Sequence, residues 1–180
     1  MKRIKQIGIS LGVLILTLFL IYWTSEFYFS PQACVEDSLR GLYFMPAEKI
    51  FDIRTENYVY YLYANDHQYA LHSVRKTALF FYVAAGGSTH NDYPKSTEPF
   101  DLDFSADQVN EVFLVHRNRP DIAKVEWELA EDSRKVLLDQ WKDDFAMIVL
   151  PRSDADSVFW QGTVRGYDAQ GKLVDERVFP

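Results

Sequence analysis

The chain has 180 residues, 48% of them hydrophobic and 16% aromatic, and its formal net charge is -7. This composition suffices for one medium domain or two small ones and excludes a disordered chain. The acidic balance argues against a nucleic-acid partner, because like charge repels phosphate backbones. Cys34 is the only cysteine, so an internal disulfide and a structural thiolate zinc site are excluded.

The N-terminus combines a basic start with a long apolar stretch. Residues 1–6 carry three basic side chains and no acidic one, and residues 7–25 carry no charge. The strongly apolar part ends with Tyr22 and Trp23, aromatic types that favour the membrane–water interface. We therefore predict a transmembrane signal-anchor at 7–25. By the positive-inside rule, residues 1–6 are cytoplasmic and residues 30–180 extracytoplasmic.

Cleavage of this segment, which would release a secreted protein, is the alternative. Signal peptides end in small residues, but the segment ends with the bulky Tyr22 and Trp23. Cys34 does not follow a lipobox, which argues against a lipoprotein. We expect the anchor to stay in place, with the lipid bilayer as its first partner.

Residues 30–85 predict a short helix followed by an antiparallel β-meander. In the segment "SPQACVEDSLRGL", Ser30 suits the N-cap, Pro31 the first helical position and Gly41 the C-terminal stop. Strand patterns follow from Ile50 onward, and the turn-like "ANDH" separates two of them.

A tyrosine-rich stretch, "NYVYYLYANDHQYALHSVRK", forms the centre of the predicted meander. Both faces of its first strand are apolar, which is typical of a strand covered on both sides. The helix at 31–41 is the expected cover of one face, and the C-terminal region or a partner covers the other. We interpret the tyrosines as core packing, with a recognition surface as the alternative.

The composition changes at residues 86–99, "GGSTHNDYPKSTEP", which we interpret as a linker or long loop. Residues 100–180 then read as short strands and predict a small immunoglobulin-like β-sandwich. Its core would contain Trp127, Trp141 and Trp160, and the segment from Asp168 to Gly171 fits a hairpin loop. The overall fold class is α+β, mostly β.

A resemblance rests on the order of three segments. The "SPQACVEDSLR" helix after a short anchor, the Tyr-rich hairpin and the "FFYVAAGG" strand together resemble small uncharacterised membrane-anchored extracytoplasmic proteins of Bacilli. The resemblance covers most of the chain and implies the same placement at the cell membrane. It supplies no active-site residue.

Possible chemistry is sparse along the chain. No phosphate loop, nucleotide fingerprint or serine elbow is present, and we expect no cofactor and no catalytic residue. His90 with Asp92 is a possible acid–base or metal pair, and Cys34 falls in a helical first turn where a thiol pKa is lowered. The candidate binding surface comprises Tyr61, Tyr63, His67, Tyr69, His90, Asp92 and Tyr93.

A calcium site is a further candidate at "DLDFSADQVNEV". Asp101, Asp103 and Asp107 alternate as in an EF-hand loop, but Ala106 and Val112 replace its glycine and its bidentate glutamate. An EF-hand is therefore rejected, and only a weaker calcium site is considered. The alternative is a polar strand edge with Leu102 and Phe104 inward.

These observations favour a non-enzymatic extracytoplasmic binding module tethered by one N-terminal helix. Its partner would be a protein or a component of the cell envelope. A membrane-tethered sensor or regulatory subunit is the first alternative, and a cell-envelope hydrolase is the second.

Overall fold

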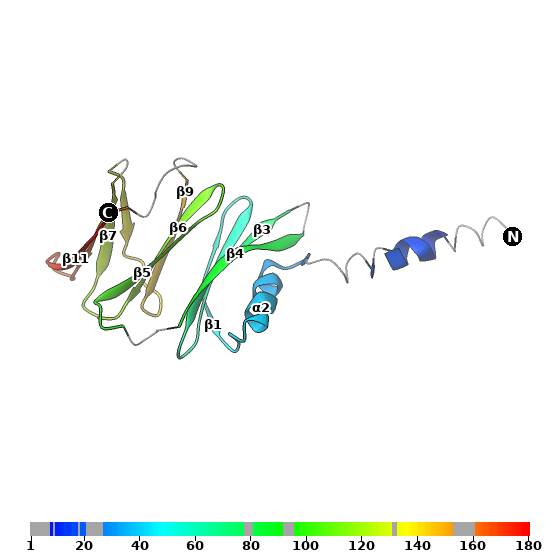
Figure 1. Cartoon of the computed structure of the whole chain (residues 1–180), viewed down its shortest axis with the longest axis horizontal. Coiled ribbons are helices and arrows are strands. Elements are labelled where there is room, and N and C mark those ends of the chain that lie inside the picture. The colour runs from blue at the N-terminus through cyan, green and yellow to red at the C-terminus, as the bar shows by residue number, and fades with distance from the viewer. Residues whose placement is uncertain are drawn as a thin grey trace.

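The computed structural model describes residues 8, 10–17, 19–20, 27–77, 81–91, 96–130, 133–152 and 161–180 (Figure 1). The described residues before position 21 are helical. No helix within these ranges has both the length and the apolar character that a membrane crossing needs. Part of the predicted anchor at 7–25, and all of the basic segment at 1–6, lie outside the described residues.

Helix α2 spans Pro31–Gly41 and begins as the sequence predicts. The Ser30 hydroxyl accepts a hydrogen bond from the Ala33 N–H at 3.4 Å, and Pro31 occupies the first turn. The predicted stop needs correction, because Gly41 is still helical. The left-handed residue beyond the helix end is Tyr43, with φ of 58°, where glycine is the usual choice.

The predicted meander is confirmed as a four-stranded antiparallel sheet in chain order. Its strands are β1 (Glu48–Arg54), β2 (Tyr58–Ala64), β3 (Tyr69–Lys76) and β4 (Tyr82–His90). The interpretation of residues 86–99 as linker is wrong at its start, because β4 continues to His90. Residues 86–90 pair with β3, so the strand continues through both glycines.

The predicted β-sandwich is also confirmed. One sheet has the order β5-β6-β9, formed by Phe100–Ala106, Asn110–Arg117 and Phe145–Pro151. The other has the order β11-β10-β7-β8, formed by Leu173–Phe179, Gly162–Tyr167, Lys124–Leu129 and Lys135–Leu138. The predicted loop before β11 is present, with Gly171 at φ 78°.

Trp127 lies fully buried between the two sandwich sheets, and Trp141 packs partly buried against the same core. Leu102 and Phe104 of β5 face this core, as expected for a strand whose aspartates lie on the other side. Trp160 lies outside the described residues.

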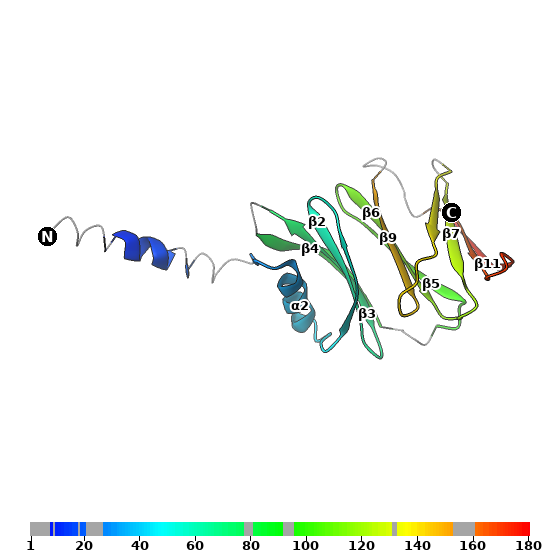
Figure 2. The same ribbon diagram turned by 180° about the vertical axis from the view of Figure 1, so that it is seen from behind.

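The described residues from 27 to 180 form the part of the protein that we call the head. It is built of four layers (Figures 1 and 2). Helix α2 covers one face of the meander, and the β5-β6-β9 sheet covers the other. The β11-β10-β7-β8 sheet closes the far side. The central strands of the meander, β2 and β3, are therefore buried on both faces, and the two β regions share the core that lies between them.

The two apolar faces of β2 are explained by this layering. Tyr58, Tyr60 and Leu62 pack toward the sandwich, whereas the side chains between them pack toward α2. The sequence-based interpretation of the tyrosine hairpin as two-sided core packing is thus confirmed.

Candidate functional site

The predicted binding surface does not form one surface. Tyr61, Tyr63 and Tyr69 are buried, so the prediction that they form an exposed binding surface on the hairpin is wrong. Their rings fill the space beneath α2 or between the sheets, where apolar burial stabilises the fold. His67 is exposed in the turn between β2 and β3. His90 is partly exposed on β4, whereas Asp92 and Tyr93 lie outside the described residues.

Two other candidates need correction. Cys34 is fully buried under the meander, and burial, with a smaller effect of Asp37, raises the pKa of its thiol to about 11. Burial thus overrides the helix-terminus effect, and the thiol is not poised as a nucleophile. The calcium candidate fails as well, since no group of three metal-ligating side chains occurs in the part of the chain that the structure describes.

The three aspartates of the calcium candidate take separate structural roles. Asp107 accepts hydrogen bonds from the Val109 and Asn110 N–H groups at 2.8 Å and from the Tyr60 hydroxyl. Asp101 and Asp103 lie on the face of β5 turned toward the meander, and each contacts a different histidine. A shared cation among the three is therefore not supported.

A polar seam joins β3 and β4 of the meander to β5 of the sandwich. The His90 Nε2 lies 2.8 Å from the Asp103 Oδ2, and the Ser88 hydroxyl donates to the same oxygen at 3.0 Å. The Tyr69 ring stacks on His90 with centroids 4.6 Å apart. The contact with Asp103 is the largest of the effects that raise the pKa of His90, because it favours the imidazolium.

A second polar group extends the seam along β5. Asp101 accepts hydrogen bonds from Ser96 at 2.7 Å and Asn118 at 2.8 Å, and the His116 Nδ1 lies 3.7 Å away. Burial alone would raise the pKa of Asp101, but these partners outweigh it and lower the pKa. Of these two histidine–aspartate contacts, only His90–Asp103 joins the β regions, because Asp101 and His116 lie opposite each other on neighbouring strands of the sandwich.

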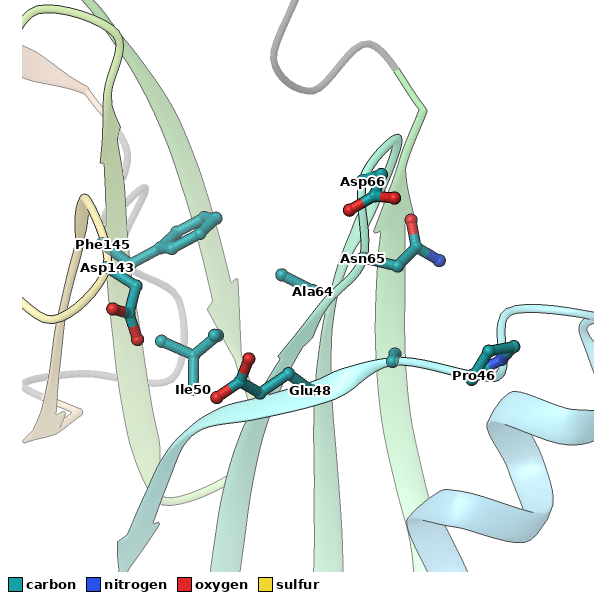
Figure 3. A pocket seen from close by; sticks show the side chains of 9 residues that line it. Pro46, Glu48, Ile50, Ala64, Asn65, Asp66, Asp143 and Phe145 are labelled. Atoms are coloured by element: carbon teal, nitrogen blue, oxygen red, sulfur yellow. The ribbon is translucent and has the colours of Figure 1, made fainter.

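An open cleft of about 630 Å³ lies where the first edge of the meander meets the sandwich (Figure 3). Its apolar floor is formed by Ile50 of β1, Ala64 of β2 and Phe145 of β9. Phe145 also connects the cleft to the seam, because its ring lies 5.4 Å from that of Tyr69 and 4.7 Å from that of His116.

The rim of the cleft is acidic. Glu48, Asp66 and Asp143 line it, and none of them forms an ion pair with a residue in the described ranges. Figure 3 shows the side chains of Glu48 and Asp143 extending toward the floor at Ile50 from two sides. The nearby Lys142 is already engaged, since its ammonium group donates to the Ile50 carbonyl.

Backbone geometry fixes the two loops that carry this rim. Asp143 and Asp144 have φ of 49° and 68°, and Lys142 and Phe145 exchange backbone hydrogen bonds, as in a type I′ turn. Opposite them, the Asn65 side chain accepts from the Gln68 N–H at 2.9 Å and donates to the Phe44 carbonyl at 3.0 Å. Both rims are therefore tied to the body of the head.

Sequence reasoning missed this cleft because its residues come from three separated segments. The signal in the sequence is weak: "ANDH" predicts a turn, and "KDD" (142–144) is only a short charged stretch. Neither pattern indicates that the two turns face each other across an apolar floor.

Comparison with models of protein families, with curated proteins and with solved structures found no match.

Proposed function

We propose that the protein is a non-enzymatic extracytoplasmic binding module, held at the cell membrane by residues 7–25, whose sandwich is immunoglobulin-like. The order of the sandwich strands supports the last point. Numbered A to G in chain order, they form the sheets A-B-E and G-F-C-D. This arrangement differs from the constant-type immunoglobulin sandwich only in the fourth strand, which pairs with the third rather than the fifth.

The proposed anchor is supported by the described part of the N-terminal helix. Leu11, Val13, Leu14, Ile15 and Leu16 are each more than half exposed. Side chains on all sides of this helix are thus apolar and uncovered by the head, which is costly in water and favourable in lipid. The basic residues before it orient the head to the extracytoplasmic side.

The cleft is the observation that carries the binding function. It has an apolar floor, carboxylates on opposite rims and a volume within the range typical of ligand sites. Glu48 and Asp143 attract positive charge, while Ile50 and Phe145 favour apolar contact. We propose that the ligand is a segment of a protein or envelope component that carries both a cationic and an apolar group.

A photo-crosslinking residue placed at Asp66 in the full-length chain, in native membranes, tests this function. The matched control carries the same residue at Glu56, which is exposed in the turn between β1 and β2 and does not line the cleft. We expect one partner to be captured from position 66 and not from position 56. Mass spectrometry of the crosslinked segment should find lysine or arginine beside apolar groups. Identical products from both positions would contradict the proposal.

Charge variants sharpen this test. Glu48→Gln with Asp143→Asn removes two charges from the cleft, and Glu56→Gln with Asp139→Asn removes two exposed charges elsewhere. We expect only the cleft pair to reduce capture, by about tenfold, and to reduce its dependence on salt.

The alternative of a sensor or regulatory subunit is favoured by one feature: the residues after the anchor are bonded to the head. The Tyr28 N–H and carbonyl both pair with Tyr82, so force on the anchor reaches the meander directly. A hydrolase is less supported. Ser88 and His90 both contact Asp103, so the imidazole does not lie between hydroxyl and carboxylate as in a hydrolytic triad.

A further inference from the structure

The chain that enters the head is fixed at Tyr28. Its N–H donates to the Tyr82 carbonyl at 2.9 Å, and its carbonyl accepts from the Tyr82 N–H at 2.8 Å. The Tyr28 hydroxyl donates to Asp37 of α2 at 2.5 Å. Residue 28 is thus held by β4 and by α2 together, and the head cannot swing about this residue as on a free linker.

Three phenylalanines cluster around this attachment. Phe81 lies with its ring centroid 5.8 Å from that of Phe27 and 5.2 Å from that of Phe29. Phe27 is 41% exposed and Phe29 54% exposed. We name Phe27, Phe29 and Phe81 the aromatic foot. Clustered exposed aromatic rings favour an interfacial or apolar surrounding over water.

Covalent geometry limits how far the foot can lie from the membrane. Three residues lie between Trp23, at the end of the apolar segment, and Phe27, and the four residue steps between these two positions span at most about 14 Å in a fully extended chain. The interfacial region of a bilayer is itself about 5–7 Å thick on each side. Aromatic side chains accumulate in this region because their rings suit its mixed polarity.

We infer that the aromatic foot lies in the lipid–water interface and docks the head on the same membrane that holds its anchor; this inference rests on the proposed anchor. The end of the head nearest the N-terminal segment carries α2 and the β3–β4 edge, and β11 lies at the opposite end (Figures 1 and 2). Docking of the foot therefore directs the sandwich away from the bilayer.

Charge near the foot supports the same occupant. Lys76 is in register with Tyr82, which is bridged to Tyr28, so a basic residue lies two strands from the chain entry. Arg75 and Lys76 are exposed and form no ion pair with residues in the described ranges. On a chain of net charge -7, two such cations at this end complement anionic lipid headgroups.

The test measures the depth of a spin label in full-length protein reconstituted into vesicles of phosphatidylcholine with one quarter phosphatidylglycerol. Thr77→Cys places the label beside the foot, because the Thr77 N–H donates to the Phe81 carbonyl at 2.9 Å. Gln170→Cys places it in the exposed turn before β11. Cys34 is fully buried and stays in place, and protein without an added cysteine measures its background labelling.

We expect the ratio of collisions with oxygen to collisions with a water-soluble nickel complex to be at least threefold higher for the label at 77 than for that at 170. The double substitution Phe29→Ser and Phe81→Ser should lower the collision ratio at 77 to the ratio at 170. The protein should stay resistant to carbonate extraction. If the protein with an unaltered aromatic foot gives equal collision ratios at 77 and 170 and still resists carbonate extraction, the docking is wrong and the anchor stands. Extraction by carbonate overturns the anchor, and the docking with it.

Discussion

The meander and the sandwich bury their strands by different means. The sandwich has a core of its own, where Trp127 is fully buried and meets Phe113 edge to face at 5.1 Å. The meander is a single sheet and depends on its neighbours, with α2 over one face and the β5-β6-β9 sheet over the other. The sandwich can therefore supply most of its own apolar burial, whereas the meander cannot.

Side-chain chemistry differs in the same way. The meander is rich in tyrosine, and its buried hydroxyls need partners from other layers. Tyr60 donates to Asp107 and accepts from the Asn110 side chain at 2.9 Å, both in the sandwich, whereas Tyr63 reaches Glu36 of α2 at 3.5 Å. These contacts make the meander the layer that joins the helix to the sandwich, and we expect the head to unfold as one unit.

The largest expected effect is in the sandwich core. Trp127→Ala should lower the free energy of unfolding by about 3–5 kcal/mol, because it leaves a cavity among well-packed rings. Urea unfolding of the full-length chain in detergent measures the change. Leu137→Ala, at a position 45% exposed on the neighbouring strand β8, is the control and should change it little. Similar losses from both variants would contradict a specific core.

A large-to-small substitution in the core between α2 and the meander tests whether the meander and the sandwich unfold together. Leu39→Ala, at a fully buried position of α2, should cost about 2–5 kcal/mol and shift the same single transition. Tryptophan fluorescence reports mainly the sandwich, and near-ultraviolet circular dichroism also reports the meander tyrosines. Two separate transitions, with only one moved by Leu39→Ala, would refute the single unit.

The pairing of β3 with β4 depends on Gly87. A methyl group added there would lie 2.6 Å from the His72 ring, so Gly87→Ala should lower the free energy of unfolding by about 1–3 kcal/mol. Gly86→Ala is a close control, because its added methyl would meet only the Ser73 hydroxyl at 3.7 Å. Thermal unfolding compares the two variants, and equal midpoints would show that the ring moves aside freely.

The seam between the regions should make stability depend on pH. Asp103 raises the pKa of His90 above its unfolded value of about 6.5. The resulting stabilisation is therefore complete below that value and is lost as the pH rises through the folded pKa. Asp103→Asn should thus be more destabilising at pH 5.5 than at pH 8. The expected difference is under about 1 kcal/mol, because the imidazole is 37% exposed and partly screened.

Urea titrations at both pH values measure this difference. Ser88→Ala, which removes the neutral hydrogen bond to the same carboxylate, is the control and should cost the same at both. His72 acts in the opposite direction, since burial lowers the pKa of its imidazole. Its effect is common to the wild type and both variants and cancels in the comparison. An equal loss from Asp103→Asn at the two pH values would exclude the charge contact.

The smallest expected effect is at the end of α2. Tyr43 is 94% exposed and left-handed, so Tyr43→Gly relieves backbone strain but adds freedom to the unfolded chain. The net result should be a stabilisation of about 0.5 kcal/mol, measured by thermal unfolding. Leu42→Gly, at φ of -90°, is the control and should not stabilise.

The sequence by itself determined the local elements of this protein. Four local features could be predicted, because each depends on residues close together in the chain. They are the cap at Ser30, the turn at "ANDH", the loop before β11 and the alternation around Trp127. The two apolar faces of β2 also predicted two covers, since neither could be left in water.

Only the tertiary structure decided which surfaces are open. It buried Tyr61, Tyr63 and Cys34, which had been candidates for function, and brought Glu48, Asp66 and Asp143 around one cleft. The physical reason is the range of the interactions. Hydrogen bonding and periodicity act between near neighbours in sequence, whereas the cleft and the seam exist only where separate sheets pack together.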